Sequence, residues 1–334
     1  MAERPIFLLI DGHALIYRAF YAFPGLTAPD GRLINAVYGF TRILLKAIAE
    51  YEPKYLAVTF DHPTPTFRHQ DFAGYKAHRA EMPDELKPQV EIIKQVVAAL
   101  NIPQFELAGF EADDLIGTIS CQLDQKTDRK RWGEVLTVIV TGDRDAFQLV
   151  DDNTHVWLPA RGKFQTDKEY DSQAVMEKMG VTPKQIIDLK ALMGDSSDDI
   201  PGVKGIGPKT AVGLVQAFDN IENLYMALES QNNSVDVADK VKAAAEVVLS
   251  PDQEKVLTKS VRQKLSTDKD NAFLSKKLAT IDCQAPIELD LSACVISSYD
   301  KEAAIAIFKE LDFGSLIHML PVDEFEASVQ QALF

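Results

Sequence analysis

Acidic side chains stand directly after the most apolar stretches of this sequence, and such positions favour metal-ion chemistry. Four acids follow three such stretches: Asp11, Asp61, Asp143 and Asp145. Carboxylate oxygens are the ligands that hard ions such as Mg²⁺ and Mn²⁺ prefer. These acids therefore predict an oxygen-lined ion site if the fold brings the ends of the stretches together.

Two other segments add acids at helical spacing. In FEADDLIG, Glu111 and Asp114 are three residues apart and share a helix face, with Asp113 beside them, and GDSSD repeats the spacing. The nine candidate ligands are Asp11, Asp61, Glu111, Asp113, Asp114, Asp143, Asp145, Asp195 and Asp198. Nine converging carboxylates need compensating cations. The simplest interpretation is a pair of ions about 4 Å apart, as in enzymes that catalyse phosphoryl transfer, with some of the acids binding the ions through water.

Each acid taken singly has a simpler explanation. Asp and Glu are common at helix N-caps and in turns after strands, and Asp113 fits a cap. Caps do not explain why every apolar stretch stops on an acid. A Ser/His/Asp arrangement finds no support, and the histidines, at positions 13, 62, 69, 78, 155 and 318, lack metal-ligand spacing.

The apolar stretches must be strands for this chemistry to work. Residues 6–10, 55–60 and 135–140 are short, β-branched and without alternation, which predicts strands buried on both faces. Helical periodicity at 33–50 and 88–100 separates them. Alternating strands and helices predict an α/β fold with a parallel sheet, in which the carboxyl ends of the strands meet at one crevice.

From about residue 178 the strand signals stop and helical patterns take over. In VTPKQIIDLKALMG, Thr182 is the expected N-cap and Pro183 the first helical residue. We therefore expect an α/β core at 1–177 and a helical module with a C-terminal extension at 178–334. The polar stretch 229–240 predicts a surface loop between helices.

The bulk composition is that of a globular protein with an acidic balance. The 334 residues are 46% hydrophobic, with a net charge of −15. No apolar run approaches membrane-helix length, so we expect no membrane contact and a cytoplasmic location. Cys121, Cys283 and Cys294 are too few and too scattered for a disulfide framework and are expected to be plain core thiols. The acidic total argues against nucleic acid unless the acids gather in one metal-filled pocket and leave basic surface elsewhere.

One such basic stretch lies between the second strand and the helix at 88. It carries Arg68, Lys76 and Arg79 among aromatic residues that include Tyr75. Cations that follow phosphates and rings that stack on bases suit single-stranded nucleic acid. A surface helix with its rings buried explains this segment equally well. The basic residues at 125–133 predict a solvated loop.

The glycine-rich stretch GVKGIGPKTA predicts a tight hairpin between two helices. Gly205 and Gly207 free the backbone, while Lys204 and Lys209 supply charge for phosphate oxygens at the helix start. The alternative is a plain inter-helix turn. A P-loop is excluded because Pro208 separates the last glycine from the lysine.

At this point the motifs resemble a known family, the 5′ nuclease domain of bacterial DNA polymerase I and its flap endonuclease relatives. The likeness extends over IDGHALIYRAFYA, FEADDLIGT, VTGDRDAFQLV, LKALMGDSSDDIPGVKGIGPKTA, AFLSKKLATI and ELDFGSLIHML. The resemblance implies a PIN-like core, a helix-three-turn-helix module of the helix-hairpin-helix type and a helical arch at about 64–88 threaded by the 5′ strand. It also implies two Mg²⁺ ions, replaceable by Mn²⁺, and K⁺ at the hairpin.

The resemblance also implies roles for single residues. The nine acids would be metal ligands, and Arg68, Lys76 and Arg79 would act in catalysis by steadying the scissile phosphate. The expected DNA-binding residues are Arg18, Tyr75, Lys204, Gly205, Gly207, Lys209 and Thr210. Asp199 departs from the family's usual Asn, which puts metal preference in question.

Together these features predict a structure-specific 5′-3′ exonuclease and flap endonuclease for primer removal and DNA repair. Its expected partners are DNA with a 5′ flap or 5′ end at a duplex junction and RNA primers on DNA, and it is expected to be monomeric. A non-catalytic junction-binding protein and a PIN-type ribonuclease are the alternatives. Because the sequence ends at Phe334, we expect no polymerase or proofreading activity; whether it is a fragment or a standalone protein stays open.

Overall fold

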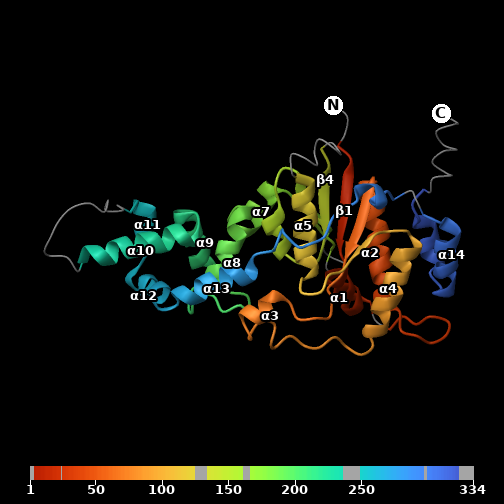
Figure 1. The fold of residues 1–334 in the computed structure, drawn as a ribbon, viewed down its shortest axis with the longest axis horizontal. Coiled ribbons are helices and arrows are strands. Elements are labelled where there is room, and N and C mark those ends of the chain that lie inside the picture. The colour runs from red at the N-terminus through yellow and green to blue at the C-terminus, as the bar shows by residue number, and fades with distance from the viewer. Residues whose placement is uncertain are drawn as a thin grey trace. The chain divides into compact units, whose positions relative to one another are not determined.

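Figure 1 shows a computed structural model of the chain. It describes residues 4–23, 25–124, 134–160, 166–235, 249–296 and 299–322, without the side chains of 231–235. Two units are formed: Met1–Phe67, Ala80–Asp171 and Ile281–Phe334 in the first, Arg68–Arg79 and Ser172–Thr280 in the second. The predicted division between 177 and 178 stays a prediction. The boundaries of the two units differ from this division. Residues 68–79 pack with the helices of the second unit, and the described residues from 281 on pack with the first unit.

The first unit is built on a six-stranded sheet. Its strands are β1 (Ile6–Asp11), β2 (Tyr55–Thr59), β3 (Gln104–Phe105), β4 (Leu136–Val140), β5 (Thr154–Leu158) and β6 (Lys168–Tyr170). Their order is β3-β2-β1-β4-β5-β6, and all are parallel except β6, which is antiparallel to β5. The three predicted strands are β1, β2 and β4, three of the four inner strands of the sheet. The predicted α/β class with a mostly parallel sheet is confirmed.

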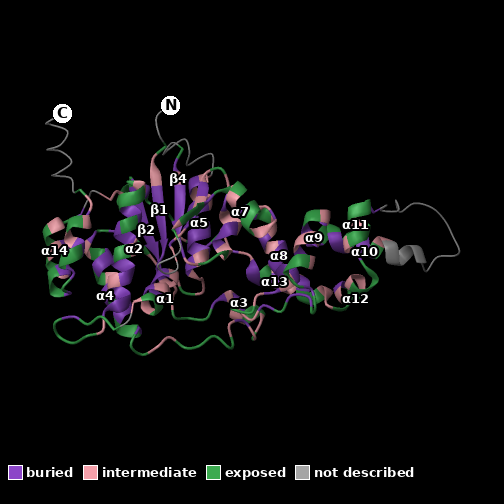
Figure 2. Ribbon diagram, turned by 180° about the vertical axis from the view of Figure 1, so that it is seen from behind, coloured by how far each residue is buried: buried purple, intermediate pink, exposed green. Residues whose placement is uncertain are grey.

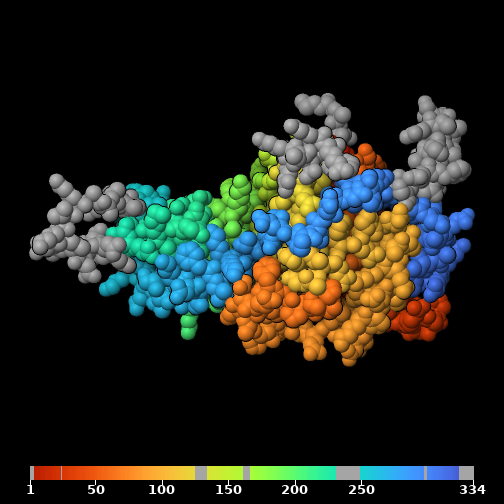
Figure 3. All heavy atoms as spheres, viewed as in Figure 1, coloured from red at the N-terminus to blue at the C-terminus, as the bar shows by residue number. Residues whose placement is uncertain are grey.

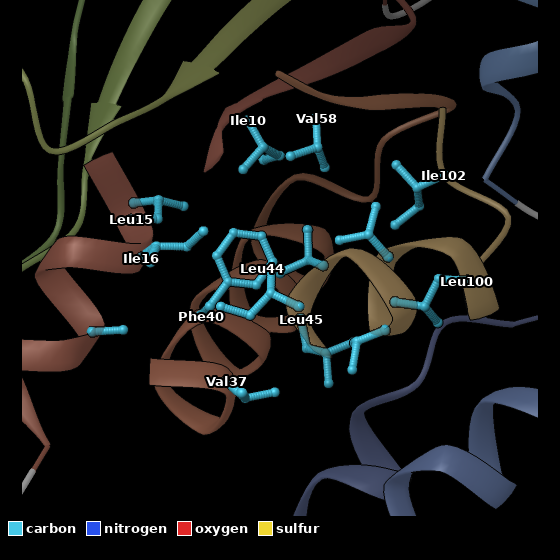
Figure 4. Close-up of a cluster of buried hydrophobic side chains, with 14 of the residues drawn as sticks. Ile10, Leu15, Ile16, Val37, Phe40, Leu44, Leu45, Val58, Leu100 and Ile102 are labelled. Carbon is cyan, nitrogen blue, oxygen red and sulfur yellow. The ribbon is translucent and has the colours of Figure 1, made fainter. Parts of the chain in front are cut away.

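Helices cover both faces of this sheet, and the central strands are buried (Figure 2). The helical elements are α1 (Gly12–Ala22), α2 (Asn35–Tyr51), α4 (Lys87–Ala99), α5 (Ala112–Asp124), η1 (Asp145–Leu149), η3 (Leu291–Cys294), α14 (Lys301–Glu310) and η4 (Gly314–Met319). The predicted helices at 33–50 and 88–100 correspond to α2 and α4. Ile10 and Val58 of the strands pack with Phe40 and Leu44 of α2 in an extended cluster of buried apolar side chains (Figure 4).

The described part of the second unit is helical. Its elements are α3 (Phe67–Asp71), α7 (Ser172–Met179), η2 (Pro183–Gln185), α8 (Ile186–Met193), α9 (Pro208–Phe218), α10 (Ile221–Val235), α11 (Pro251–Val256), α12 (Lys259–Thr267) and α13 (Lys269–Ala279). The first residue of α3, Phe67, still belongs to the first unit. Thr182 and Gln185 form a capping box at the predicted helix start. The loop prediction for 229–240 is wrong as far as Val235, where α10 ends, and its remainder lies outside the described residues. So does the predicted basic loop at 125–133.

A helix that crosses a membrane must be long and apolar. Among the described residues, no helix of the chain has the length and hydropathy to span a bilayer.

Candidate active site

The carboxyl ends of β1 and β4 lie side by side at the centre of the sheet, where the strand order reverses. Asp11 ends β1 and caps α1, since its Oδ1 accepts the Ala14 N–H at 3.0 Å. Its Oδ2 accepts the hydroxyl of Thr141 at 2.6 Å, and Thr141 Oγ1 in turn accepts the Asp143 N–H at 3.0 Å. Thr141 therefore links the acids that follow two neighbouring strands.

Asp61, which follows β2, reaches the same end of the sheet from the other side of β1. Its Oδ1 accepts the Ala112 N–H at 2.7 Å, so it caps the start of α5. The Asp61 N–H donates to His13 Nδ1 at 2.9 Å. A carboxylate at a helix start is stabilised by the exposed amides there. Asp61 thus fixes the position of the helix whose first turn carries Asp113 and Asp114.

The acids that follow three strand ends raise one another's pKa values. Burial, reinforced by the charges of Asp61 and Asp143, raises the pKa of Asp11 to about 7 despite its hydrogen bonds. The pKa of Asp113 is raised well above its usual value, first by burial and then by the charges of Asp11, Asp143, Asp145 and Asp61. A divalent cation among these carboxylates would relieve both effects.

Asp114 is placed differently from its neighbour. It is fully buried, and its two carboxylate oxygens accept the backbone N–H groups of Glu111 at 3.0 Å and Asp282 at 2.9 Å. Glu111 itself is partly exposed just before α5. Within the described ranges, no three His, Cys, Asp or Glu side chains are grouped closely enough to hold one ion. The nine ligand assignments stay predictions.

The remaining two acids lie in the second unit, in the loop after α8. Asp195 and Ile200 exchange two backbone hydrogen bonds of 2.9 and 2.8 Å, which close the loop. The Asp195 carboxylate accepts from Lys190 Nζ at 2.6 Å and from the N–H and hydroxyl of Ser197 at 2.8 and 2.5 Å. Burial opposes ionisation, but Lys190 and Ser197 outweigh it and hold the pKa of Asp195 below its usual value. Lys190 is thus a partner that the sequence reasoning missed.

The second acid of this loop contacts the predicted arch. Lys76, at a left-handed φ of 53°, donates its N–H to the Asp198 carbonyl at 3.0 Å, and its Nζ lies 3.8 Å from Asp198 Oδ2. Asp199 accepts from the N–H and Nδ1 of His78 at 2.9 and 3.0 Å. The residue that departs from the family pattern therefore holds the segment 68–79 against this loop.

Arg68 and Tyr75 of the same segment are buried. The Arg68 guanidinium is 3% exposed and donates to the carbonyls of Leu278 at 2.9 Å and Thr280 at 2.8 Å, at the carboxyl end of α13. Tyr75 is also 3% exposed, and Lys76 Nζ lies 4.9 Å from its ring centroid. The alternative of a surface helix with buried rings is met only in part, because Phe67 and Phe72 are half-buried and α3 ends at Asp71, before Tyr75. The phosphate and base contacts of Arg68 and Tyr75 stay predictions, as does that of Arg79, which is exposed.

The glycine-rich stretch forms the expected hairpin between α8 and α9. Gly202 has a φ of 61°, and a Cβ there would lie 2.3 Å from the Gly194 nitrogen, so only glycine fits. Lys204 donates its N–H to Asp268 Oδ2 at 2.9 Å. Gly207 caps α9 and Pro208 opens it. The predicted phosphate-binding residues Lys204, Gly205, Gly207 and Lys209 are exposed, and Thr210 is half-buried.

Arg18 lies in the first unit near the acids. Its guanidinium donates to the carbonyls of Pro159 and Ala160, and its Nη1 would be 3.8 Å from a Cβ at Gly142. Gly142 stands between Thr141 and Asp143, so Arg18 is placed next to the crevice, and its DNA contact stays a prediction. Thr141 and His13 were missed because their roles depend on neighbours far away in the sequence.

Acids at the carboxyl ends of parallel strands, followed along the chain by a helical unit with a glycine hairpin, define a class of metal-site nuclease folds. Comparison with known families shows which family of this class the chain matches. The chain belongs to the 5′-3′ exonuclease family. The family's N-terminal resolvase-like domain matches residues 6–180, and its C-terminal SAM fold matches 181–302. The family and the nuclease class predicted from the motifs are confirmed.

The relatives agree with this assignment. The chain is 40% identical over 334 residues to DNA polymerase I of Bacillus subtilis (strain 168), which covers 100% of the chain and 34% of the relative. It is 39% identical over 311 residues to the thermostable DNA polymerase I of Thermus filiformis, covering 93% and 32%. The chain thus spans about a third of the length of these relatives.

Solved structures share the fold. A T5 5′-exonuclease structure with bound zinc aligns with a TM-score of 0.60 and 20% identity, covering 93% of this chain and 99% of that chain. The catalytic core of Rad2 in complex with DNA substrate aligns with a TM-score of 0.54 and 17% identity, covering 95% and 93%.

Proposed function

We propose that this chain hydrolyses DNA phosphodiester bonds near the junction of a 5′ flap with duplex and also trims 5′ ends. The observation that carries the proposal is the raised pKa of Asp113, because four other acids from three strand ends contribute to it. Such a concentration of negative charge is unfavourable for folding alone and suits a divalent-metal centre. In a cell this activity would remove RNA primers and displaced strands.

The donor set fits hard cations. Its members are carboxylates, and their mutual repulsion is what a cation would relieve. We propose two Mg²⁺ ions, replaceable by Mn²⁺, held by the nine predicted acids directly or through water, and K⁺ at the hairpin. When bound, the divalent ions lower the pKa of a water nucleophile and neutralise charge on the reacting phosphate.

The chain's own residues orient this chemistry. Thr141 holds one Asp11 oxygen toward β4, and Asp61 fixes the start of α5. We propose that Lys76 and Arg79 steady the scissile phosphate, and that Lys76 exchanges its contact with Asp198 for one with DNA. Arg68 would act on catalysis by positioning this segment on α13.

Duplex DNA would be held by the hairpin. Backbone amides at the start of α9 together with Lys204 and Lys209 suit phosphate oxygens without reading sequence. A solved bacteriophage T5 flap endonuclease, with a TM-score of 0.58 and 19% identity to this chain, is described as a complex with DNA and metal ions. We propose the same ligands here, with the enzyme acting as a monomer.

The test compares Mg²⁺-dependent cleavage of 5′-flap DNA with cleavage of single-stranded RNA. We expect flap cleavage near the junction, and we expect Asp143→Ala to abolish it while binding of the flap in Ca²⁺ stays within about threefold, since Asp143 serves the chemistry. Tight junction binding without cleavage would favour the non-catalytic alternative. Preferential RNA cutting would favour the ribonuclease. Loss of binding without loss of turnover in Asp143→Ala would contradict the assigned role.

A further inference from the structure

A segment of the first unit that follows the second-unit helices lies along α5. In Figure 3 this segment is drawn in blue at the surface against the yellow atoms of α5. Side chains on successive turns of α5 bind its backbone: Asp114 to the Asp282 N–H at 2.9 Å, Thr118 to the Ala285 N–H at 3.0 Å, and Gln122 to the Ile287 carbonyl at 2.8 Å and the Leu289 N–H at 3.1 Å. We call residues 281–289 the strap.

Two cysteines face each other across this contact. Gly117 lets the strap approach closely, because a Cβ there would lie 2.6 Å from Ile281 Cγ2 and 3.4 Å from Cys283 Sγ. Cys121 lies one turn further along the same face of α5, and the Cys121 and Cys283 thiols each shift the pKa of the other. Both are partly exposed, whereas Cys294 is 1% exposed. The expectation of plain core thiols fits Cys294 better than this pair.

We propose that Cys121 and Cys283 are a redox-sensitive thiol pair that a low-molecular-weight disulfide converts into an intramolecular disulfide, covalently fastening the strap to α5. In the first step the Cys121 thiolate attacks the external disulfide and releases one small thiol. The Cys283 sulfur then attacks the Cys121 sulfur, and a second small thiol leaves. Two protein thiols are oxidised and one external disulfide is reduced to two thiols.

The environment of the pair gives each sulfur a distinct part in this exchange. The Cys283 thiol lowers the pKa of Cys121, although burial and the nearby acids Asp124 and Asp151 oppose this effect. The Cys121 thiol, together with burial, raises the pKa of Cys283. Cys121 is therefore the attacking sulfur, and Cys283 resolves the mixed disulfide. Because Cys283 Sγ lies against Gly117, one turn from Cys121 on the same face of α5, rotation of the two side chains is the movement needed to reach the S–S bond length of about 2 Å.

The test incubates the reduced, full chain with glutathione disulfide and measures intact mass, free thiols after denaturation, and cross-linked peptides. We expect loss of two hydrogens, a single remaining thiol at Cys294, and a peptide pair joining positions 121 and 283. We also expect the melting temperature to rise by about 5 °C or more and to return on reduction, because the bond restricts the unfolded chain. None of these readouts depends on the proposed nuclease activity.

Matched variants locate the bond. Cys121→Ser and Cys283→Ser should each take up one glutathione at the remaining cysteine of the pair and form no internal cross-link, whereas Cys294→Ser should still form it. The mass measurement on the native chain decides the question even if a variant folds poorly. Glutathione attached separately to both cysteines, a cross-link to Cys294, or two thiols that stay reduced while a small thiol control is consumed would each overturn the proposal.

Discussion

Among single residues, Asp11 couples stability to pH in the metal-free protein. Its pKa is about 7 in the fold against 3.8 in its usual environment, mainly because burial disfavours the charge. Below about pH 4 both the folded and the unfolded chain hold the proton; between about pH 4 and 7 only the unfolded chain releases it. The stability that this proton supplies is therefore lost as pH rises through about 7.

Replacing Asp11 by the isosteric Asn removes this titration. In magnesium-free buffer, we expect Asp11→Asn to gain unfolding free energy relative to the native chain as pH rises from about 4 to 7, by up to roughly 4 kcal/mol. Urea unfolding at each pH measures the difference. The exposed Asp152→Asn serves as a control and should show no comparable trend. If the difference in unfolding free energy between the two proteins stayed constant with pH, the pKa of Asp11 would not be raised in the fold.

Replacement by Asn should affect stability differently at the neighbouring positions Asp113 and Asp114. Asp114→Asn leaves one of two buried backbone N–H groups facing an amide NH₂, so we expect a loss of about 1–3 kcal/mol of unfolding free energy. Asp113→Asn removes a carboxylate whose charge four other acids disfavour, so metal-free stability should not fall, while Mg²⁺-dependent flap cleavage should be lost. Denaturant unfolding and a cleavage assay on both variants check this. Equal destabilisation by the two changes would be evidence against separate roles.

Between elements, the Arg68 guanidinium ties the segment 68–79 to the end of α13. Its two hydrogen bonds to backbone carbonyls use the fork geometry that an ammonium group lacks. We expect Arg68→Lys to lower unfolding free energy by about 1–3 kcal/mol and to speed proteolysis within 68–79. The matched Arg79→Lys, at an exposed position of the same segment, should do neither. Unchanged proteolysis in Arg68→Lys would mean that other contacts hold the segment.

The central elements could be predicted from the sequence because their signals are local. Strands β1, β2 and β4 consist mostly of apolar residues, and the helices beside them have a clear period. Strand β3 has two residues and β6 three, too short for a pattern, and the polar residues that suggested a loop at 229–235 continue α10. Local patterns also placed the acids at strand ends, but not Lys190 beside Asp195, since that contact exists only after folding.

Across the whole molecule, an overall charge of −15 would repel DNA if charge were spread evenly. Seven of the nine predicted metal ligands belong to the first unit, and the exposed Lys204 and Lys209 stand in the hairpin of the second. Binding to DNA depends on the counterions that are released where lysines and arginines contact its phosphates. The positions of these side chains therefore matter more than the net charge of the chain. Two lysines with equal effect on the net charge should therefore differ in their effect on binding.

Lys209 and Lys309 offer that comparison. Each is exposed, and each change to Gln makes the net charge more negative by one unit. If Lys209 neutralises a phosphate, the slope of log binding constant against log salt for flap DNA in Ca²⁺ should fall by about 1 in Lys209→Gln, with weaker binding at every salt concentration. Lys309→Gln, on α14 of the first unit, should leave the slope unchanged. Equal slopes in the two variants would mean that DNA responds to the total charge of the chain, and that the hairpin does not contact the duplex.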